Sequence, residues 1–281
     1  MNERAQEKIT QLQPWHCSSC KKRFDRWSQI CPVCAGIATL SSLPIKYAQS
    51  KSLERRSRTL KEIAEESAQQ NSKERIRCGL PKIDKLLNGG FVLGSVTLLA
   101  GEPGIGKSTL ALQLAASMGK KHKCIYLSGE ETLQQIAMRA ERLKVHDNDN
   151  LRFLGERELD VALLEAQQFE QEFLIVDSVQ TVSLEDDGQG AGGASQVKMC
   201  AEYLVEHAKL TGCIVVIVGH ITKEEAIAGP QVLMHLVDTV LMFQSVDESK
   251  KSPRRTLYVK KHRFGPAQIT QSLEMTEKGL I

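Results

Sequence analysis

A glycine-rich segment in the middle of the chain, GEPGIGKS from Gly101 to Ser108, has the residue types and spacing of a phosphate-binding loop. It follows an apolar run and opens a helical pattern, so that glycine N–H groups and the positive end of a helix dipole can converge on phosphate oxygens. We predict an ATP site in which Lys107 bridges the β- and γ-phosphates and Ser108 holds Mg²⁺. The residues expected to contact the nucleotide are Gly101, Glu102, Pro103, Gly104, Ile105, Gly106, Lys107, Ser108 and Thr109.

Acidic residues at the ends of two other apolar runs are candidates for holding the metal and activating water. Asp177 ends FLIVD, a position from which a carboxylate can hold Mg²⁺ through water. Hydrolysis also needs a group that polarises the attacking water, and we assign Glu130 to this role with Glu131 in reserve. A pair of acids stabilising a helix N-terminus is the alternative. His220, after CIVVIVG, fits either a phosphate sensor or a structural histidine.

Four cysteines near the start have the spacing of a metal site. Cys17 and Cys20 form one C-x2-C pair, and Cys31 and Cys34 form another ten residues later. Four thiolates suit the tetrahedral geometry of structural Zn²⁺, and a segment this short cannot fold by apolar burial alone. We therefore predict a zinc site made by the four cysteines, with His16 as a possible additional ligand.

These candidate residues sit on a pattern of alternating strands and helices. Short apolar runs that do not alternate with polar residues, interleaved with helical segments, indicate a mostly parallel sheet covered on both faces. We expect a zinc-binding module at 1–40, a basic linker at 41–77 and an α/β domain at 78–281. The expected strands are 96–100, 124–128, 173–178, 213–220, 239–244 and 256–261, and the expected helices are 107–119, 132–143 and 195–210.

Composition fits a globular protein of the cytoplasm. The chain has 281 residues, 41% hydrophobic and 25% charged, and its polar start argues against a signal peptide. No apolar run is long enough to span a bilayer. The first 77 residues carry 15 Lys or Arg against 8 Asp or Glu, which fits either a nucleic-acid-binding arm or a solvated linker. The remaining cysteines, Cys78, Cys124, Cys200 and Cys213, are expected in the core.

A row of positive charge ends the last of these strands, at Lys260, Lys261, His262 and Arg263. Strand alternation would place Lys261 and Arg263 on one face, so that both could act on a single phosphate group. The alternative is an edge strand whose charges prevent aggregation.

The order of these segments, from the cysteine module through GEPGIGKS, YLSGEE, LIVDSVQT and GHITKEEAIAGPQ to KKHRFG, resembles the RadA family, also called Sms, of bacterial DNA repair proteins. The resemblance covers nearly the whole chain. It implies a RecA-like P-loop NTPase core, ATP hydrolysis, a hexameric ring, and binding to single-stranded and branched DNA. The family continues into a domain resembling the Lon protease fold, beyond the position of Ile281 in this chain.

The resemblance also implies roles for particular residues. Lys261 and Arg263 match two cations that reach the neighbour's nucleotide, an arrangement that can accelerate hydrolysis by about 10³ to 10⁵. His262 stands where the family has Asn, which would make this contact sensitive to pH. The segments 183–196 and 221–231 correspond to DNA-contacting loops. Their charges are mixed, with acids at Glu185, Asp186, Asp187, Glu224 and Glu225, a cation at Lys223, and Gln231 where a cation is usual.

Three functions fit these features. The first is a DNA-dependent ATPase of recombinational repair that moves along branched intermediates as a ring. The second is an ATP-switched assembly protein that docks a replication or recombination protein through its zinc module, without motor activity. The third, a nucleotide-binding kinase or similar monomeric P-loop enzyme, leaves Lys261 and Arg263 unexplained.

Overall fold

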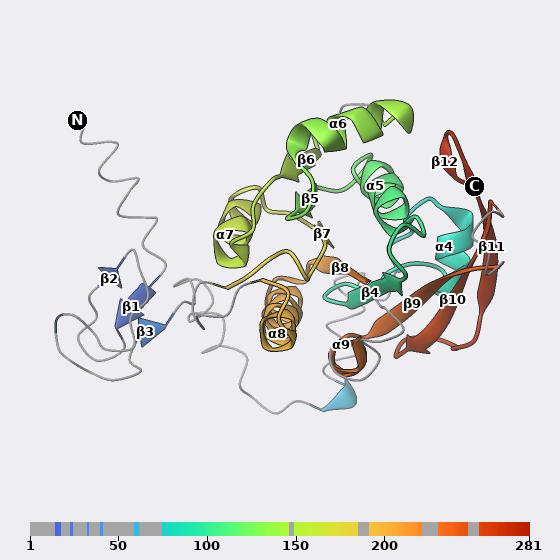
Figure 1. Cartoon of the computed structure of the whole chain (residues 1–281). Helices are drawn as coiled ribbons and strands as arrows, with labels where there is room; N and C mark the ends of the chain where they lie inside the picture. Colours follow the sequence, from blue (N-terminus) through green and yellow to red (C-terminus); the bar gives the residue numbers. More distant parts are fainter. Residues whose placement is uncertain are drawn as a thin grey trace. The chain divides into compact units, whose positions relative to one another are not determined.

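The computed structural model describes residues 15–17, 23–24, 33, 40–41, 59–61, 75–145, 149–184, 191–220, 230–246 and 253–281. The chain divides into two compact units, Met1–Glu66 and Ser67–Ile281, so the second unit begins inside the segment expected as a linker. Figure 1 shows both units, each of which is described by itself. Among the described helices, none combines the length and apolar character needed to cross a bilayer.

The first unit contains a small antiparallel sheet in the order β2-β1-β3. Its strands are β1 (Trp15–Cys17), β2 (Arg23–Phe24) and β3 (Leu40–Ser41). Cys17 is fully buried at the end of β1, opposite Leu40. Cys20, Cys31 and Cys34 lie outside the described residues, so the zinc site stays a prediction.

The second unit is built on a nine-stranded sheet in the order β12-β11-β10-β9-β4-β8-β7-β5-β6. The six strands from β9 to β6 pair in parallel, whereas β10, β11 and β12 extend the sheet in antiparallel. This confirms the mostly parallel α/β core. The strands are β4 (Val96–Gly101), β5 (Cys124–Ser128), β6 (Leu151–Leu154), β7 (Phe173–Asp177), β8 (Ile214–His220), β9 (Thr239–Ser245), β10 (Arg254–His262), β11 (Thr270–Thr276) and β12 (Gly279–Leu280).

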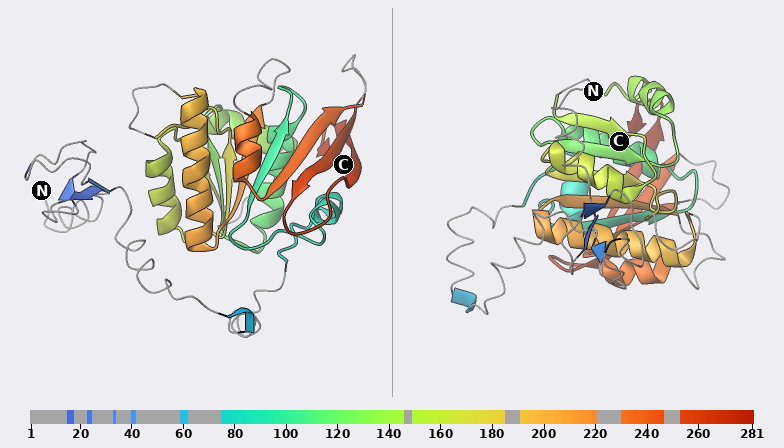
Figure 2. Two further views of the ribbon diagram at one scale, coloured as in Figure 1. Left: turned by 90° about the horizontal axis from the view of Figure 1, so that it is seen from below. Right: turned by 90° about the vertical axis from the view of Figure 1, so that its left-hand side faces the viewer.

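Helices cover both faces of this sheet (Figure 2). One face packs against α4 (Pro81–Leu86), α5 (Lys107–Met118) and α6 (Leu133–Arg142). The other packs against α7 (Leu159–Gln168), α8 (Ala194–Thr211) and α9 (Pro230–Leu236). Residues alternate between the two cores along the central strands β4, β5, β7, β8 and β9. In β8, for example, Val216 joins the first core and Ile217 the second.

The scattered cysteines lie in these cores, as predicted. Cys78 and Cys124 belong to the α5 side, and Cys200 and Cys213 belong to the α8 side. None of the four is more than 2% exposed. They therefore act as small apolar residues, and burial raises the pKa of the Cys213 thiol to about 12.

The strand that ends in the basic row is not at the edge of the sheet. β10 lies between β9 and β11, so the edge-strand alternative is wrong. Its ladder with β9 shifts register between Val259 and Lys261, which is a bulge. Beyond β10, the carbonyl oxygen of Phe264 accepts a hydrogen bond from the Arg75 guanidinium, which also donates to Leu87 O at 3.0 Å. Arg75, near the end of the expected linker, is thus packed on the second unit.

Candidate nucleotide-binding site

The glycine-rich loop connects β4, the middle strand of the nine-stranded sheet, to α5. β4 is buried along its whole length and delivers Gly101 to the carboxyl edge of the sheet. Gly104 and Gly106 have φ angles of 75° and 113°, which disfavour residues with a side chain. A Cβ on Gly106 would also come within 2.5 Å of Met275 Cε in β11. Backbone conformation therefore favours glycine at both positions, and at Gly106 a side chain would also displace the end of Met275.

The first turn of α5 forms a cradle for an anion. Gly106 is the N-cap residue and provides no side chain, so the first N–H groups of the helix have no side-chain cap. Lys107 is buried, and its ammonium donates hydrogen bonds of 2.9 Å to the carbonyl oxygens of Gly101 and Glu102. Burial lowers the pKa of Lys107 from 10.5 to about 8, although Asp177, Glu130 and Glu102 oppose this shift.

Asp177 lies at the end of β7, where it can serve a metal ion. The strand is buried throughout, and Asp177 as a residue is only 3% exposed. The Tyr126 hydroxyl donates a hydrogen bond to Asp177 Oδ2, whereas Oδ1 is buried without a described partner. One carboxylate oxygen is therefore held in place and the other is available to water or a metal ion. Oxygen ligands of this type, together with the Ser108 hydroxyl, are those that Mg²⁺ prefers.

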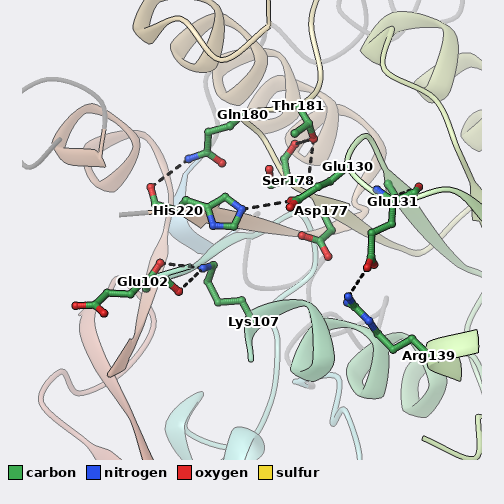
Figure 3. A network of polar contacts seen from close by, with 12 residues as sticks. Glu102, Lys107, Glu130, Glu131, Arg139, Asp177, Ser178, Gln180, Thr181 and His220 are labelled. Atoms are coloured by element: carbon green, nitrogen blue, oxygen red, sulfur yellow. Dashed lines mark hydrogen bonds and ion pairs between the residues drawn. The ribbon is translucent and has the colours of Figure 1, made fainter. Parts of the chain in front are cut away.

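The two consecutive glutamates have different surroundings (Figure 3). Glu130 Oε2 lies 3.5 Å from His220 Nε2, on the side of the site that faces the glycine-rich loop. Glu131 turns toward α6 and forms an ion pair with Arg139. Burial raises the pKa of Glu131. Geometry thus separates a half-exposed carboxylate near the phosphate site from one held in a structural ion pair.

His220 lies beside the glycine-rich loop because β8 and β4 are parallel neighbours. Its Cα is paired with that of Gly101. The Gln180 amide donates a 3.2 Å hydrogen bond to the His220 carbonyl oxygen, and the imidazole Nδ1 is buried without a described partner. Ser178 Oγ and Gln180 Oε1 are also buried and unpartnered. In Figure 3 the His220 ring lies beside the end of Lys107, with Gln180 and Ser178 beyond it, and bound nucleotide, metal or water would satisfy these buried atoms. The residues present therefore fit MgATP.

Lys261 and Arg263 lie at the opposite end of the sheet, measured along the strands, from the glycine-rich loop. β10 is antiparallel to β9, and His262 is paired with Thr239, which is level with Thr97 near the start of β4. This is four residues, or about 13 Å, along β4 from Gly101. Neither cation therefore belongs to the cluster around Lys107.

Both cations have partners within the chain. Lys261 Nζ donates hydrogen bonds of 2.9, 3.2 and 2.7 Å to the carbonyl oxygens of Met234, His235 and Val237, at the end of α9. Arg263 Nη1 is 3.1 Å from Asp238 Oδ1. Lys261 and Arg263 thus point to the same α9–β9 segment. Burial, and then the neighbouring Arg263 charge, lower the pKa of Lys261.

His262 points in another direction. Its Nδ1 lies 2.9 Å from the Thr239 hydroxyl, and its ring packs edge-on against Phe264. Burial, and then the charge of Arg75, lower the pKa of His262. Both effects favour the neutral ring.

Several important residues were not identified from the sequence. Tyr126, Arg139 and Asp238 contact the side chains of Asp177, Glu131 and Arg263 respectively, and Gln180 binds the backbone carbonyl of His220. The available signal was that Gln180 and Asp238 adjoin strand ends, where α/β proteins place polar site residues. Residues 185–187 and 223–225 of the expected DNA loops lie outside the described residues, and nothing of the Gln231 side chain is described.

Comparison with known proteins identifies the family. A protein-family model described as AAA domain matches residues 63–226. The chain is 37% identical to DNA repair protein RadA of Pseudomonas aeruginosa and 36% identical to that of Bacillus subtilis, over 94% of this chain in both cases. The alignments span 58% of the length of these relatives.

A solved structure supports the fold independently. The KaiC-like protein PH0186 of Pyrococcus horikoshii matches 74% of this chain and 98% of its own, with a TM-score of 0.62 and 16% sequence identity. At this identity the likeness concerns the fold alone. Taken with the geometry of the phosphate site, these matches show that the chain belongs to the AAA domain family and is a homologue of the bacterial DNA repair protein RadA.

Proposed function

We propose that this protein is a DNA-dependent ATPase of recombinational repair that acts on single-stranded and branched DNA as a ring-shaped oligomer. The observation that carries the ATPase assignment is the cluster of Lys107, Glu130, Asp177 and His220 around an uncapped helix N-terminus. In this proposal the loop and Lys107 bind the phosphates, and Ser108 and Asp177 hold Mg²⁺, which neutralises charge on the phosphates when it is bound. Glu130 orients the attacking water, and His220 connects Glu130 to the strand beside the γ-phosphate.

We base the proposed oligomer on the positions of the cations, which lie at opposite ends of the strands of the sheet. Within the described residues, Lys107 is the cation of the phosphate cluster, whereas Lys261 and Arg263 lie at the other end and cannot reach it within one subunit. A head-to-tail contact would bring one subunit's Lys261 and Arg263 to the next subunit's nucleotide. Each cation would then exchange its partners at the end of α9 and Asp238 for phosphate oxygens. Since α9 follows a proposed DNA loop, this exchange offers a physical link between DNA and ATP.

The ATPase proposal is tested by turnover with and without DNA. We expect single-stranded or branched DNA to raise the rate, and Lys107→Ala to abolish it through loss of phosphate binding. An ATPase rate that does not change when DNA is added would contradict the proposed DNA-dependent activity. If ATP nevertheless changed the oligomeric state, the ATP-switched assembly protein would be the better description.

The in-trans contact is tested by mixing two inactive variants. Lys107→Ala lacks its own site but supplies Arg263, whereas Arg263→Gln retains its own site but cannot complete a neighbour's. In a random mixed ring, about a quarter of the head-to-tail interfaces would combine an intact site with an intact arginine, so activity should return. No recovery by two folded, co-assembling variants would rule out action across subunits. Thermal unfolding of Arg263→Gln checks that loss of the Asp238 ion pair leaves the fold intact.

Zinc binding by Cys17, Cys20, Cys31 and Cys34 is a separate part of the proposal. The buried position of Cys17 at a strand end supports it, because a ligand thiolate is normally shielded from water. Elemental analysis should find one zinc per chain. The double variant Cys31→Ser/Cys34→Ser should contain less zinc.

A further inference from the structure

A second basic site lies far from the phosphate loop, at the other end of α5. A solvent-facing cavity of about 630 Å³ is formed where the turn after α5 meets the start of the ATPase fold and α4. α5 has 12 residues and is about 18 Å long, so this cavity is separated from the glycine-rich loop by the full length of the helix. The charged residues of its lining are Arg77, Asp84, Lys85, Lys120, Lys121 and His122.

The lysines and the arginine of this cavity form no ion pairs with other described residues. Lys85, Lys120 and Lys121 are exposed, and among the described residues no ion pair is formed by them or by Arg77. The lining has one carboxylate, Asp84, whose two oxygens accept hydrogen bonds from the backbone N–H groups of Cys78 and Gly79. His122 already lies 3.4 Å from Glu172. Within the described lining, four cations therefore share one concave surface with a single carboxylate, which leaves an excess of positive charge.

Two further features favour an extended anion. The carbonyl groups at the end of α5 would repel a phosphate, but Gly119 N donates to Ala115 O and Lys121 N donates to Met118 O, so these oxygens are already paired. Arg77, which lines the cavity, is in sequence the last residue of a segment that carries 15 Lys or Arg against 8 Asp or Glu. Spaced positive charges on a cavity and on the adjoining chain suit a phosphodiester backbone better than a single small anion.

We propose that this cavity binds the phosphodiester backbone of DNA, as a contact separate from the expected loops 183–196 and 221–231. The inference rests on the proposed DNA-dependent function and adds a specific binding surface to it. Lys120 and Lys121 provide the central contacts, and Lys85 and Arg77 flank them. Because backbone contacts do not read bases, this surface holds strands regardless of sequence.

The test compares two double variants of the full chain with equal loss of charge. Lys120→Gln/Lys121→Gln removes the central contacts, whereas Lys209→Gln/Lys278→Gln removes two exposed lysines that lie outside the cavity. Binding of a fluorescent single-stranded oligonucleotide is measured by anisotropy over a series of salt concentrations. Loss of two phosphate contacts should make the negative slope of log K against log salt shallower by about 1.4 and weaken binding about 20-fold at 0.1 M salt. Basal ATPase activity without DNA should match the unaltered protein in both variants.

Each outcome separates this inference from the proposed function. Unaltered protein that binds DNA, with the same affinity and slope in the cavity variant, overturns the cavity and leaves the DNA-dependent ATPase in place. Unaltered protein that does not bind DNA overturns both. Displacement of the oligonucleotide by inorganic phosphate at constant ionic strength would identify a single-anion site instead. If poly-glutamate binding weakened in the cavity variant while DNA binding stayed normal, the site would belong to an acidic polypeptide, which also overturns the proposal.

Discussion

Raising the pH above 8 should weaken nucleotide binding, because the buried Lys107 loses its proton near that pH. Its ammonium is held by the carbonyl oxygens of Gly101 and Glu102, and burial lowers its pKa from 10.5 to about 8. Phosphate oxygens of bound ATP favour the charged form and raise this pKa again. Binding above pH 8 must therefore include uptake of a proton, which costs free energy as the pH rises.

The size of this effect follows from the two protonation states. With a pKa of about 8, Lys107 is about 90% charged at pH 7 and about 90% neutral at pH 9. The apparent Kd for MgATP should therefore increase about tenfold between pH 7 and pH 9, which corresponds to about 1.4 kcal/mol. The assay is titration calorimetry with MgATP, or with a non-hydrolysable analogue, at constant ionic strength. Repeating it in buffers of different ionisation enthalpy measures the proton uptake directly.

A matched control separates Lys107 from other groups that titrate in this range. Arginine stays charged at every pH used, so Lys107→Arg should bind more weakly but with a Kd that varies little between pH 7 and pH 9. A flat Kd in the unaltered protein, with no proton uptake at pH 9, would refute the reasoning. It would mean that Lys107 remains charged in the empty site despite its burial.

Two further predictions concern the glutamate pair and a buried histidine. Glu130→Gln should lower kcat about 10² to 10⁴-fold with nearly unchanged MgATP affinity. Glu131→Gln weakens the Arg139 ion pair and should mainly lower the melting temperature. Equal losses of rate in the two variants would contradict the different roles assigned to the two glutamates. His207 is buried beside Gln171, and burial lowers its pKa from 6.5 to about 4. Because the unfolded chain takes up this proton first, about 3 kcal/mol of stability, present above pH 6.5, should be lost as the pH falls toward 4. Urea unfolding should show this loss, and His207→Gln should reduce it.

The chain's local patterns predicted the core of the fold closely. The expected strands 96–100, 124–128 and 239–244 became β4, β5 and β9 with at most one residue of difference at an end. Continuous apolar runs are reliable here because strands buried on both faces need apolar residues at every position. The region of β6 and α7 was not singled out. β6 is half exposed, with one buried residue in four, so its pattern is weak.

Long-range pairing limited the prediction of the site. Strand alternation suggested that Lys261 and Arg263 act together, but it did not reveal that α9 and Asp238 would already bind them. These partners lie 24 to 27 residues away in sequence and meet the cations only because β10 folds back on β9. The choice between Glu130 and Glu131 depended in the same way on His220 and Arg139.

By itself, the sequence determined the chemistry that is local: a glycine-rich loop with its lysine at a helix start, an acid at a strand end, and the alternation of strands and helices. These features depend on neighbouring residues and on the periodicity of burial. The tertiary structure decided which polar groups share a site, because strand order brings together residues that are distant in sequence. It also decided that the two basic groups, Lys261 with Arg263 and the cavity around Lys120, lie away from the phosphate loop. The sequence shows where charged residues occur along the chain, but the packing of the sheet and helices decides which site each charged side chain faces.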